Sequence, residues 1–361
     1  MNFQGRLEKL RKALEGPLLV LSPGNVFYLS GFRGSLGFLL VFPEGKTFFF
    51  CDGRYAIQSR EELAVEAEIV EFEQDAVASI CDVFFSLSSR TNRLFVEDVA
   101  SVGFIRRFDE KKCPVIPCPS PVNALRAVKD ETEIQTIQRA VTIAEEAFRD
   151  VLPLIQEGIS EHEIAVELEY RMRRRGGEAI AFPTIVASGK RAALPHARPT
   201  SGKIKRGEWV LVDWGVRVDG YCADLTRVVP LGKIQETSFQ RAFSTLLEAQ
   251  AAALELIREG VEAKTVDQKV REVLQKSGFE RYFIHSLGHG VGIDVHEEPK
   301  LSTQSTAILC RGMVVTVEPG IYSPEWGGVR LEHMVLVEEK GCRVLDTLPE
   351  IFDEKGGENR A

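Results

Sequence analysis

The feature that most constrains this chain is an apolar, β-rich stretch, residues 209–229, that is interrupted by Asp219-Gly220. An Asp-Gly pair between two such runs predicts a β-hairpin. Asp213 and Asp224 lie inside the two expected strands, and a turn centred near residues 218–219 would set their carboxylates directly opposite each other, roughly 5 Å apart. Two poorly solvated negative charges at that distance repel each other. We therefore expect arginine side chains, backbone N–H groups or a bound cation beside them.

Two further acids lie in apolar runs near the end of the chain. Glu318 comes at the end of a β-like run that starts at Val314, and Glu332 lies in the middle of the run 328–337. A carboxylate inside an apolar strand is destabilising unless it is paired or bound to a metal. Taken singly, each acid has a simple explanation, such as an ion pair between Glu332 and nearby Arg330. Together with the two aspartates, they make four acids on predicted β segments.

Four of the six histidines lie in glycine- and proline-rich segments of the second half of the chain: His196, His285, His289 and His296. The last three fall within twelve residues and are interleaved with glycines, which let the backbone approach a ligand closely. The segment 288–292 lacks the full glycine spacing of a dinucleotide-binding loop. The histidines therefore favour a catalytic or metal site over a nucleotide site.

Four carboxylates and one candidate imidazole ligand form an oxygen-rich set that suits two divalent ions bridged by carboxylates. Mn²⁺, Co²⁺, Fe²⁺ and Zn²⁺ all accept such ligands, whereas a structural zinc site of the cysteine type does not fit them. Two ions about 3.5–4 Å apart can hold a hydroxide between them at neutral pH and polarise a substrate carbonyl. The set therefore predicts amide hydrolysis.

The chain is expected to be an α/β (α+β) protein with two domains. A mixed α/β block extends to the segment 114–121, whose four prolines cannot continue a helix or a central strand. We predict an N-terminal domain over residues 1–121, a catalytic domain over residues 122–352, and a polar, glycine-rich tail over residues 353–361.

An internal repeat marks the second domain. Four short matches share one offset of 102 residues: Gln138–Ala140 with Gln240–Ala242, Glu146-Ala147 with Glu248-Ala249, Glu157-Gly158 with Glu259-Gly260, and Gly176 with Gly278. Four matches in a constant register indicate a duplication. Two copies are too few for a solenoid, so we expect a pseudo-twofold domain with its site near the junction of the halves.

Composition excludes several classes of partner. The net charge of −8 and the absence of a basic stripe argue against nucleic acid. No apolar run approaches the roughly 20 residues that a membrane span needs. Seven scattered cysteines fit neither a disulfide framework nor a zinc ribbon, so a reducing cytoplasm is the expected location.

The motifs resemble the pita-bread metallopeptidases, in particular their proline-peptidase branch, the Xaa-Pro aminopeptidases and Xaa-Pro dipeptidases (prolidases). The resemblance covers nearly the whole chain. Four segments carry it besides the acids and histidines: Asn25–Phe32, Asp52–Tyr55, Leu125–Glu133 and Phe182–Gly189.

The resemblance implies a role for each ligand. Asp213 would be a terminal metal ligand, Asp224 and Glu332 would bridge two ions, and His289 would complete the second site with Glu318. Glu318 would also take the proton of the attacking water. Mn²⁺ is the expected metal, with Co²⁺ or Zn²⁺ as alternatives.

The resemblance also implies the residues that surround the metals. His196 and His296 would face the substrate and steady the scissile carbonyl. His285 would support the site from behind the ligands and, with Phe182, Arg198 and Tyr322, help to bind the substrate. Arg330 would orient Asp213 or Glu332.

The expected reaction is cleavage of the Xaa-Pro bond at the N-terminus of peptides, with the family suggesting a homodimer. A strict dipeptidase is the alternative, and it would need a cation such as Arg198 or Arg191 to hold the carboxylate that follows proline. His333, where proline peptidases often carry Asp, raises a methionine aminopeptidase as a second alternative. We expect its side chain to point away from the metals, because neighbouring residues of a strand alternate. A peptide-binding relative without turnover is the third, although no ligand position is lost here.

Overall fold

The computed structural model describes residues 1–88 and 93–352, so the predicted tail, 353–361, lies outside the described residues. The chain forms two compact units, Met1–Arg126 and Ala127–Ala361. Helix α6 (Pro121–Ala127) begins at the last proline of the proline-rich segment, and the units divide near its end. Among the described residues, no helix has the length and apolar character that crossing a membrane requires.

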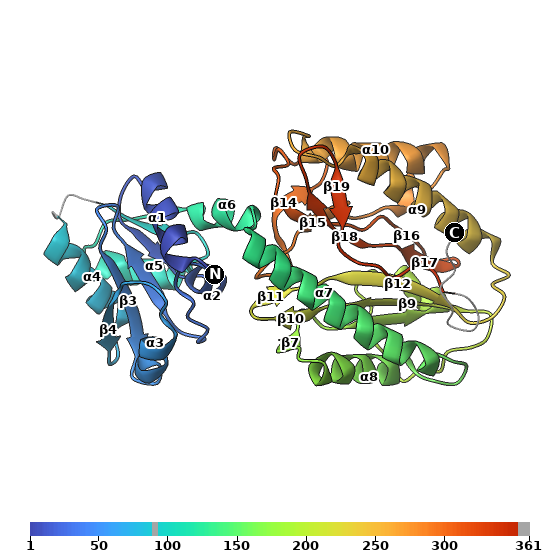
Figure 1. Ribbon diagram of the computed structural model, residues 1–361, viewed down its shortest axis with the longest axis horizontal. Coiled ribbons are helices and arrows are strands. Elements are labelled where there is room, and N and C mark those ends of the chain that lie inside the picture. Colours follow the sequence, from blue (N-terminus) through green and yellow to red (C-terminus); the bar gives the residue numbers. More distant parts are fainter. Residues whose placement is uncertain (89–92, 353–361) are drawn as a thin grey trace. The chain divides into compact units, whose positions relative to one another are not determined.

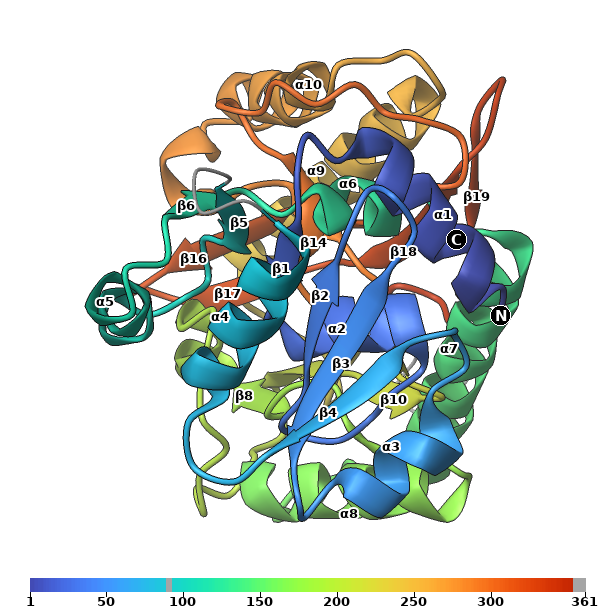
Figure 2. The ribbon, with the colours of Figure 1, turned by 90° about the vertical axis from the view of Figure 1, so that its left-hand side faces the viewer.

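The N-terminal unit is built on a six-stranded mixed sheet with the order β4-β3-β2-β1-β5-β6 (Figures 1 and 2). Strands β1, β2 and β3 pair antiparallel, whereas β3–β4, β1–β5 and β5–β6 are parallel pairs. The strands are β1 (Leu18–Val20), β2 (Phe38–Val41), β3 (Thr47–Asp52), β4 (Glu68–Phe72), β5 (Leu94–Glu97) and β6 (Val115–Cys118). The helices are α1 (Phe3–Ala13), α2 (Pro23–Ser30), α3 (Ala56–Glu62), α4 (Ala76–Leu87) and α5 (Val102–Glu110).

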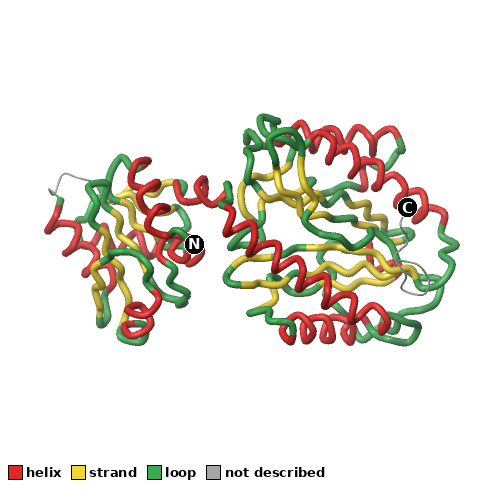
Figure 3. The backbone as a smooth tube through the Cα atoms, viewed as in Figure 1, coloured by secondary structure: helices red, strands yellow, loops and turns green. Residues whose placement is uncertain are grey.

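The second unit places its strands between two pairs of helices. In Figure 1, α9 and α10 lie along one edge of this unit and α8 along the opposite edge, and Figure 3 shows the strands between them. Its long helices are α7 (Glu131–Val151), α8 (Glu161–Arg174), α9 (Thr237–Leu256) and α10 (Ala263–Lys276). Its strands are β7 (Ala179–Ile180), β8 (Ile185–Ser188), β9 (Trp209–Trp214), β10 (Val216–Val218), β11 (Tyr221–Cys222), β12 (Leu225–Pro230), β13 (Gly288–Gly290), β14 (Glu297–Leu301), β15 (Val314–Val317), β16 (Gly320–Ser323), β17 (Gly327–Arg330), β18 (His333–Val337) and β19 (Cys342–Val344).

The predicted duplication is visible in the helices. Helices α8 and α10 have 14 residues each, and a shift of 102 residues carries the bounds of one onto the bounds of the other. The matched glycines share a conformation: φ is 88° at Gly158 and 84° at Gly260, where the backbone of each copy turns before a helix. These positive angles favour glycine, which explains why both copies carry it.

The sheets repeat as well. Strand β9 pairs antiparallel with β8 and β12, and β15 pairs antiparallel with β13 and β18. Each half therefore contains a helix pair followed by a sheet with one central strand between two antiparallel neighbours; the sheet of the first half has three strands and that of the second has five. The mixed α/β class and the pseudo-twofold catalytic domain are confirmed.

Helix α7 fixes the strand that carries the first candidate ligand. It begins with the predicted capping box, in which Asp130 and Glu133 satisfy each other's backbone N–H groups. Further along, the ring of Phe148 stacks on Trp214 with 4.3 Å between centroids, and the indole N–H of Trp214 donates to the Ala144 carbonyl at 3.0 Å. Trp214 directly follows Asp213, so these contacts hold that aspartate in place.

We expect Phe148→Ala to lower the free energy of unfolding of the catalytic unit by about 3–5 kcal/mol, because it opens a cavity under Trp214. All three tryptophans of the chain lie in this unit, so urea unfolding followed by tryptophan fluorescence reports on it. Tyr170→Ala, at an exposed position of α8, is the control and should change stability by less than about 0.5 kcal/mol. Equal effects of the two substitutions would contradict this account of the packing.

Candidate metal centre and active site

The predicted hairpin is present, but its strand pairing differs by two residues from the expected one. Asp213 is opposite Thr226 rather than Asp224. The turn consists of Asp219 and Gly220, with φ of 47° and 84°, which is the pair of positive angles that a two-residue hairpin turn of type I′ requires. The turn centre therefore falls one residue later than expected. Asp224 becomes a diagonal neighbour of Asp213 on the same face of the ladder.

The expected strand around Glu332 is also different in detail. Strand β17 ends at Arg330 and β18 begins at His333, so Glu332 lies in a break between two strands rather than in the middle of one. Its backbone carbonyl accepts a hydrogen bond from Arg227 at 2.6 Å, and its carboxylate accepts one from the Thr226 hydroxyl at 2.6 Å. These bonds to the neighbouring hairpin fix the acid within the break.

Three carboxylates meet at one point. One oxygen each of Asp213, Asp224 and Glu332 lies within 4.8 Å of the others, and all three side chains are buried. Burial, and then the charge of Glu332, raises the pKa of Asp224 well above its usual range. Burial, and then the charges of Glu318 and Asp213, does the same to the pKa of Glu332. These carboxylates therefore favour a nearby cation strongly.

His289 and Glu318 extend this cluster. The Nε2 atom of His289 is 3.3 Å from Glu318 and 3.7 Å from Asp224. Burial alone would raise the pKa of Glu318, but the hydrogen bond and charge of His289 outweigh it and lower that pKa. The Nδ1 atom of His289 donates to the Gly290 carbonyl at 3.1 Å, which leaves Nε2 facing the acids in the orientation typical of a metal ligand.

The cluster fits divalent metal ions. The Oδ1 atom of Asp213 is buried without a hydrogen-bond partner among the described residues. A buried carboxylate oxygen without a partner is destabilising, and a metal ion would satisfy it. The donor set, four carboxylates and one imidazole, is the oxygen-rich kind that accepts Mn²⁺, Co²⁺ or Zn²⁺.

Arg330 links the cluster to a chain of hydrogen bonds. Its guanidinium donates to Asp213 in a short ion pair and to the Tyr322 hydroxyl at 2.9 Å. The Tyr322 hydroxyl donates in turn to Nε2 of His285 at 3.0 Å, and Nδ1 of His285 donates to the Ser286 carbonyl at 2.7 Å. Burial raises the pKa of Tyr322 to about 12, so its hydroxyl stays a neutral donor. Of the two acids considered for Arg330, its guanidinium contacts Asp213.

The two histidines expected to face the substrate are exposed beside this cluster. His296 packs edge-on against His289, with 4.3 Å between ring centroids. Partial desolvation, and then the charge of His289, lowers the pKa of His296. His196 interacts electrostatically with Asp213, His285 and His296. The structure thus brings both histidines to the candidate metal centre.

The other predicted substrate contacts have different environments. Phe182 is half-buried, with its ring against Gly215, where an added Cβ would come within 2.7 Å of it. The Arg198 side chain is exposed, and within the described ranges it has no hydrogen bond or ion pair. Arg191 instead forms an ion pair with Glu161, with 3.0 Å between its Nε atom and the carboxylate. Its guanidinium is therefore held by the protein itself.

His333 gives no support to the methionine aminopeptidase alternative. Its Nδ1 atom is 2.8 Å from Asp346 and its Nε2 atom is 3.2 Å from Glu350. The ring therefore points away from the carboxylate cluster, in the direction that strand alternation predicts.

Lys300 is a candidate residue that the sequence analysis missed. The β13–β14 ladder places it directly opposite His289, and its exposed ammonium contributes to lowering the pKa of His296. Lys300 and His289 lie on different strands, so no periodicity within one element marks them as neighbours. Only the pairing of the two strands reveals that they are neighbours.

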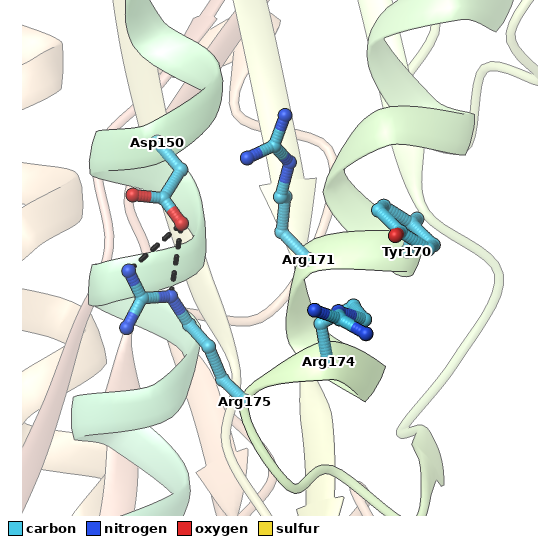
Figure 4. Close-up of a pocket in the computed structure, with 5 residues that line it drawn as sticks. All are labelled: Asp150, Tyr170, Arg171, Arg174 and Arg175. Atoms are coloured by element: carbon cyan, nitrogen blue, oxygen red, sulfur yellow. Dashed lines mark hydrogen bonds and ion pairs between the residues drawn. The ribbon is translucent and has the colours of Figure 1, made fainter.

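A separate hollow of about 360 Å³ lies between α7 and α8 (Figure 4). It is lined by Asp150, Tyr170, Arg171, Arg174 and Arg175, none of which belongs to the candidate site. Arg175 binds Asp150 through Nε at 3.0 Å and Nη2 at 2.8 Å. Arg175, at the end of α8, is thus paired with an acid of α7.

Comparison with known families identifies the class of protein. The model of metallopeptidase family M24 matches residues 135–339, and that of the creatinase/prolidase N-terminal domain matches residues 6–128. The chain belongs to metallopeptidase family M24, and it is a metallopeptidase. The expected resemblance to the pita-bread enzymes is confirmed, and the family implies divalent metal ions at the carboxylate cluster.

Individual relatives match over almost their whole length. The chain is 37% identical to an uncharacterized peptidase, YqhT, of Bacillus subtilis, over 95% of this chain and 98% of that one. It is 35% identical to an Xaa-Pro dipeptidase of Pyrococcus furiosus, over 94% and 97%. Among solved structures, it resembles an X-Pro aminopeptidase from Thermotoga maritima, with a TM-score of 0.85, 35% identity and coverage of 95% and 99%. An Xaa-Pro dipeptidase from Bacillus anthracis gives a TM-score of 0.91, 33% identity and coverage of 96% and 99%.

We expect Asp224→Asn to abolish tight binding of at least one metal ion, because it removes a negative charge that the cations require. Metal content per chain, measured by mass spectrometry after dialysis against Mn²⁺, checks this. Asp219→Asn is the matched control: it makes the same change in the same hairpin, at the exposed turn, where Asn tolerates a positive φ. Unchanged metal content together with near-normal turnover in Asp224→Asn would show that the site is assigned wrongly.

Proposed function

We propose that this metallopeptidase cleaves the Xaa-Pro bond at the N-terminus of peptides, as an Xaa-Pro aminopeptidase. The observation that carries the proposal is the convergence of the Asp213, Asp224 and Glu332 carboxylates, next to the His289–Glu318 pair. Relatives that match along nearly the whole chain are named as an Xaa-Pro dipeptidase and an X-Pro aminopeptidase. Proline-containing peptides are accordingly the proposed substrates.

The five residues of the cluster would hold two divalent ions. When bound, such ions polarise a carbonyl oxygen and make water acidic enough to attack at neutral pH. We assign Mn²⁺ as the native metal because the donor set is rich in carboxylate oxygen, with Co²⁺ and Zn²⁺ as the alternatives to be tested. A homodimer and a cytoplasmic location complete the proposal, the latter because the described cysteines are free thiols.

The remaining roles belong to side chains. Glu318 accepts a proton from the attacking water, a role that suits a carboxylate whose pKa is lowered by His289. His196 and His296 donate hydrogen bonds to the carbonyl oxygen as negative charge develops on it. Arg330 holds Asp213 in place and, through Tyr322, connects it to His285.

Specificity for longer peptides follows from the cations at the site. A strict dipeptidase needs a cation that holds the carboxylate after proline firmly. Arg191 is occupied by Glu161, and Arg198 and Lys300 are exposed side chains. An exposed ion pair contributes about 1 kcal/mol at most. The free carboxylate of a dipeptide therefore adds little to binding, and longer peptides are accepted as well.

We expect hydrolysis of both Ala-Pro-Ala and Ala-Pro, and no comparable hydrolysis of Met-Ala-Ser. The test is a product assay with Mn²⁺, Co²⁺ and Zn²⁺ supplied separately. Arg198→Ala and Lys300→Ala should each raise the KM for Ala-Pro by less than about fivefold, which corresponds to one exposed ion pair, and should leave Ala-Pro-Ala unaffected.

Three other results would each assign a different function to this protein. Activity confined to dipeptides and lost in Arg198→Ala or Lys300→Ala would make the enzyme a prolidase with a working carboxylate clamp. Preference for Met-Ala-Ser would make it a methionine aminopeptidase. Stoichiometric metal without hydrolysis of any proline peptide would make it a binding protein.

We expect His196→Ala and His296→Ala each to lower kcat about 10²–10³-fold, as the loss of one transition-state donor does, while metal content stays that of the parent protein. Steady-state kinetics on Ala-Pro-Ala and metal analysis of the same samples measure both quantities. His162→Ala, at an exposed histidine of α8, is the control and should retain activity. Loss of metal in either variant would identify that histidine as a ligand instead.

A further inference from the structure

The two substrate-facing histidines lie on loops rather than on strands or helices. His196 follows the short 3₁₀ helix Gly189–Ala193, and His296 precedes β14. A loop by itself holds a side chain loosely, yet a displacement of about 1 Å in a group that acts on the substrate can reduce turnover 10²-fold. What fastens each loop therefore matters to the reaction.

A single buried carboxylate closes the His196 loop at its base. Glu161, the first residue of α8, is 1% exposed and accepts hydrogen bonds from the backbone N–H groups of Ser188 at 2.9 Å and Thr200 at 3.0 Å. Arg191 completes the closure. Its Nε binds Glu161 at 3.0 Å and its Nη2 donates to the Arg198 carbonyl at 2.8 Å, so it joins the segment before His196 to the segment after it.

A second ion pair, buried on both sides, fastens the loop before His296. The Nζ of Lys129 is 3.3 Å from the carboxylate of Glu297, and both side chains are almost fully buried. The other oxygen of Glu297 accepts the backbone N–H of Asp294 at 3.0 Å. The chain passes close over this carboxylate, because a Cβ added at Gly292 would come within 2.5 Å of it.

The same loop is also joined to the hairpin that carries Asp224. The backbone N–H of Cys222 donates to the Gly292 carbonyl at 2.7 Å, and its thiol donates to the Ile293 carbonyl at 3.4 Å. The Lys129–Glu297 pair thus closes one side of the loop and Cys222 closes the other. His296 is held between these attachments and the His289 ring.

We propose that Lys129 and Arg191 are positioning residues, each acting through one histidine: Lys129 through His296, and Arg191 through His196. Desolvation offsets much of the attraction in a buried ion pair, so such pairs contribute more to a defined geometry than to net stability. The proposal rests on the proposed function, because it needs both histidines to act on the substrate. It adds two residues that contact neither the metal cluster nor the substrate.

Double-mutant cycles test the pairing of each positioning residue with its histidine. In the Mn²⁺-loaded enzyme acting on Ala-Pro-Ala, Lys129→Met should lower kcat by about 10–10²-fold without loss of metal. In the His296→Ala background the same change should cost less than about threefold, because residues that act as a unit are not additive. In the His196→Ala background it should keep its full effect. Arg191→Met should lose most of its effect in the His196→Ala background and keep its full effect in the His296→Ala background.

Two further variants make the cycles decisive. Lys203→Met removes an exposed ion pair with Glu163 at the start of α8, outside both loops, and should change kcat by less than about twofold. Glu297→Gln keeps the shape of the side chain and an acceptor for Asp294, so it tests the same loop if Lys129→Met does not fold. It should also lose its effect in the His296→Ala background.

Hydrogen–deuterium exchange of the metal-free protein gives a readout that does not depend on activity. Lys129→Met should increase exchange in residues 291–297 and leave residues 188–200 unchanged, whereas Arg191→Met should do the reverse. The proposal would be overturned if Lys129→Met lowered kcat as strongly in the His296→Ala background as in the parent enzyme. Equal increases of exchange in both loops would overturn it as well. Wild-type kcat in His196→Ala and His296→Ala would instead refute the roles of the histidines in the proposed function.

Discussion

The mutual repulsion of buried carboxylates is the constraint on which the catalytic unit depends. Asp213, Asp224 and Glu332 converge in a desolvated site, and the pKa of each is raised by that burial. Arg330 supplies positive charge at one side of the cluster and the His289 ring lies at another, but Oδ1 of Asp213 still has no partner among the described residues. A fold stabilised by its own contacts alone would not keep such a cluster. Divalent ions, which the family implies, would explain its place in a metallopeptidase.

Duplication explains how one chain brings these acids together. The ladder of the first half contributes Asp213 and Asp224, and the ladder of the second half contributes Glu318 and Glu332. Each half has its own helix pair beside its strands (Figure 1), and the three carboxylates that the two halves contribute converge at one centre. The histidines do not repeat in this way. His289 comes from a strand of the second half, whereas His196 and His296 come from loops.

Local patterns in the sequence predicted the acids, the repeat and the helix starts, because each depends on neighbouring residues. The strand pairing of the first hairpin was wrong by two residues, because Asp219 adopts a positive φ that places the turn centre one residue later. The break before His333 was missed because the apolar run continues through it. Long-range partners had no local signal at all: Lys129 and Glu297 are separated by 168 positions, and Lys300 faces His289 only through strand pairing.

The acids are supported by paired strands and the two substrate-facing histidines by loops, so the two groups of residues have different roles in the proposed site. Acids on or directly beside paired strands keep their separations when a loop changes, because the ladders fix their backbone. The histidine loops are closed instead by the buried carboxylates of Glu161 and Glu297, and Cys222 joins the His296 loop to the hairpin that carries Asp224. In the proposed function, metal binding and substrate recognition are thus carried by separate elements. Members of such a family can then keep one metal centre while the loops set which peptide is cleaved.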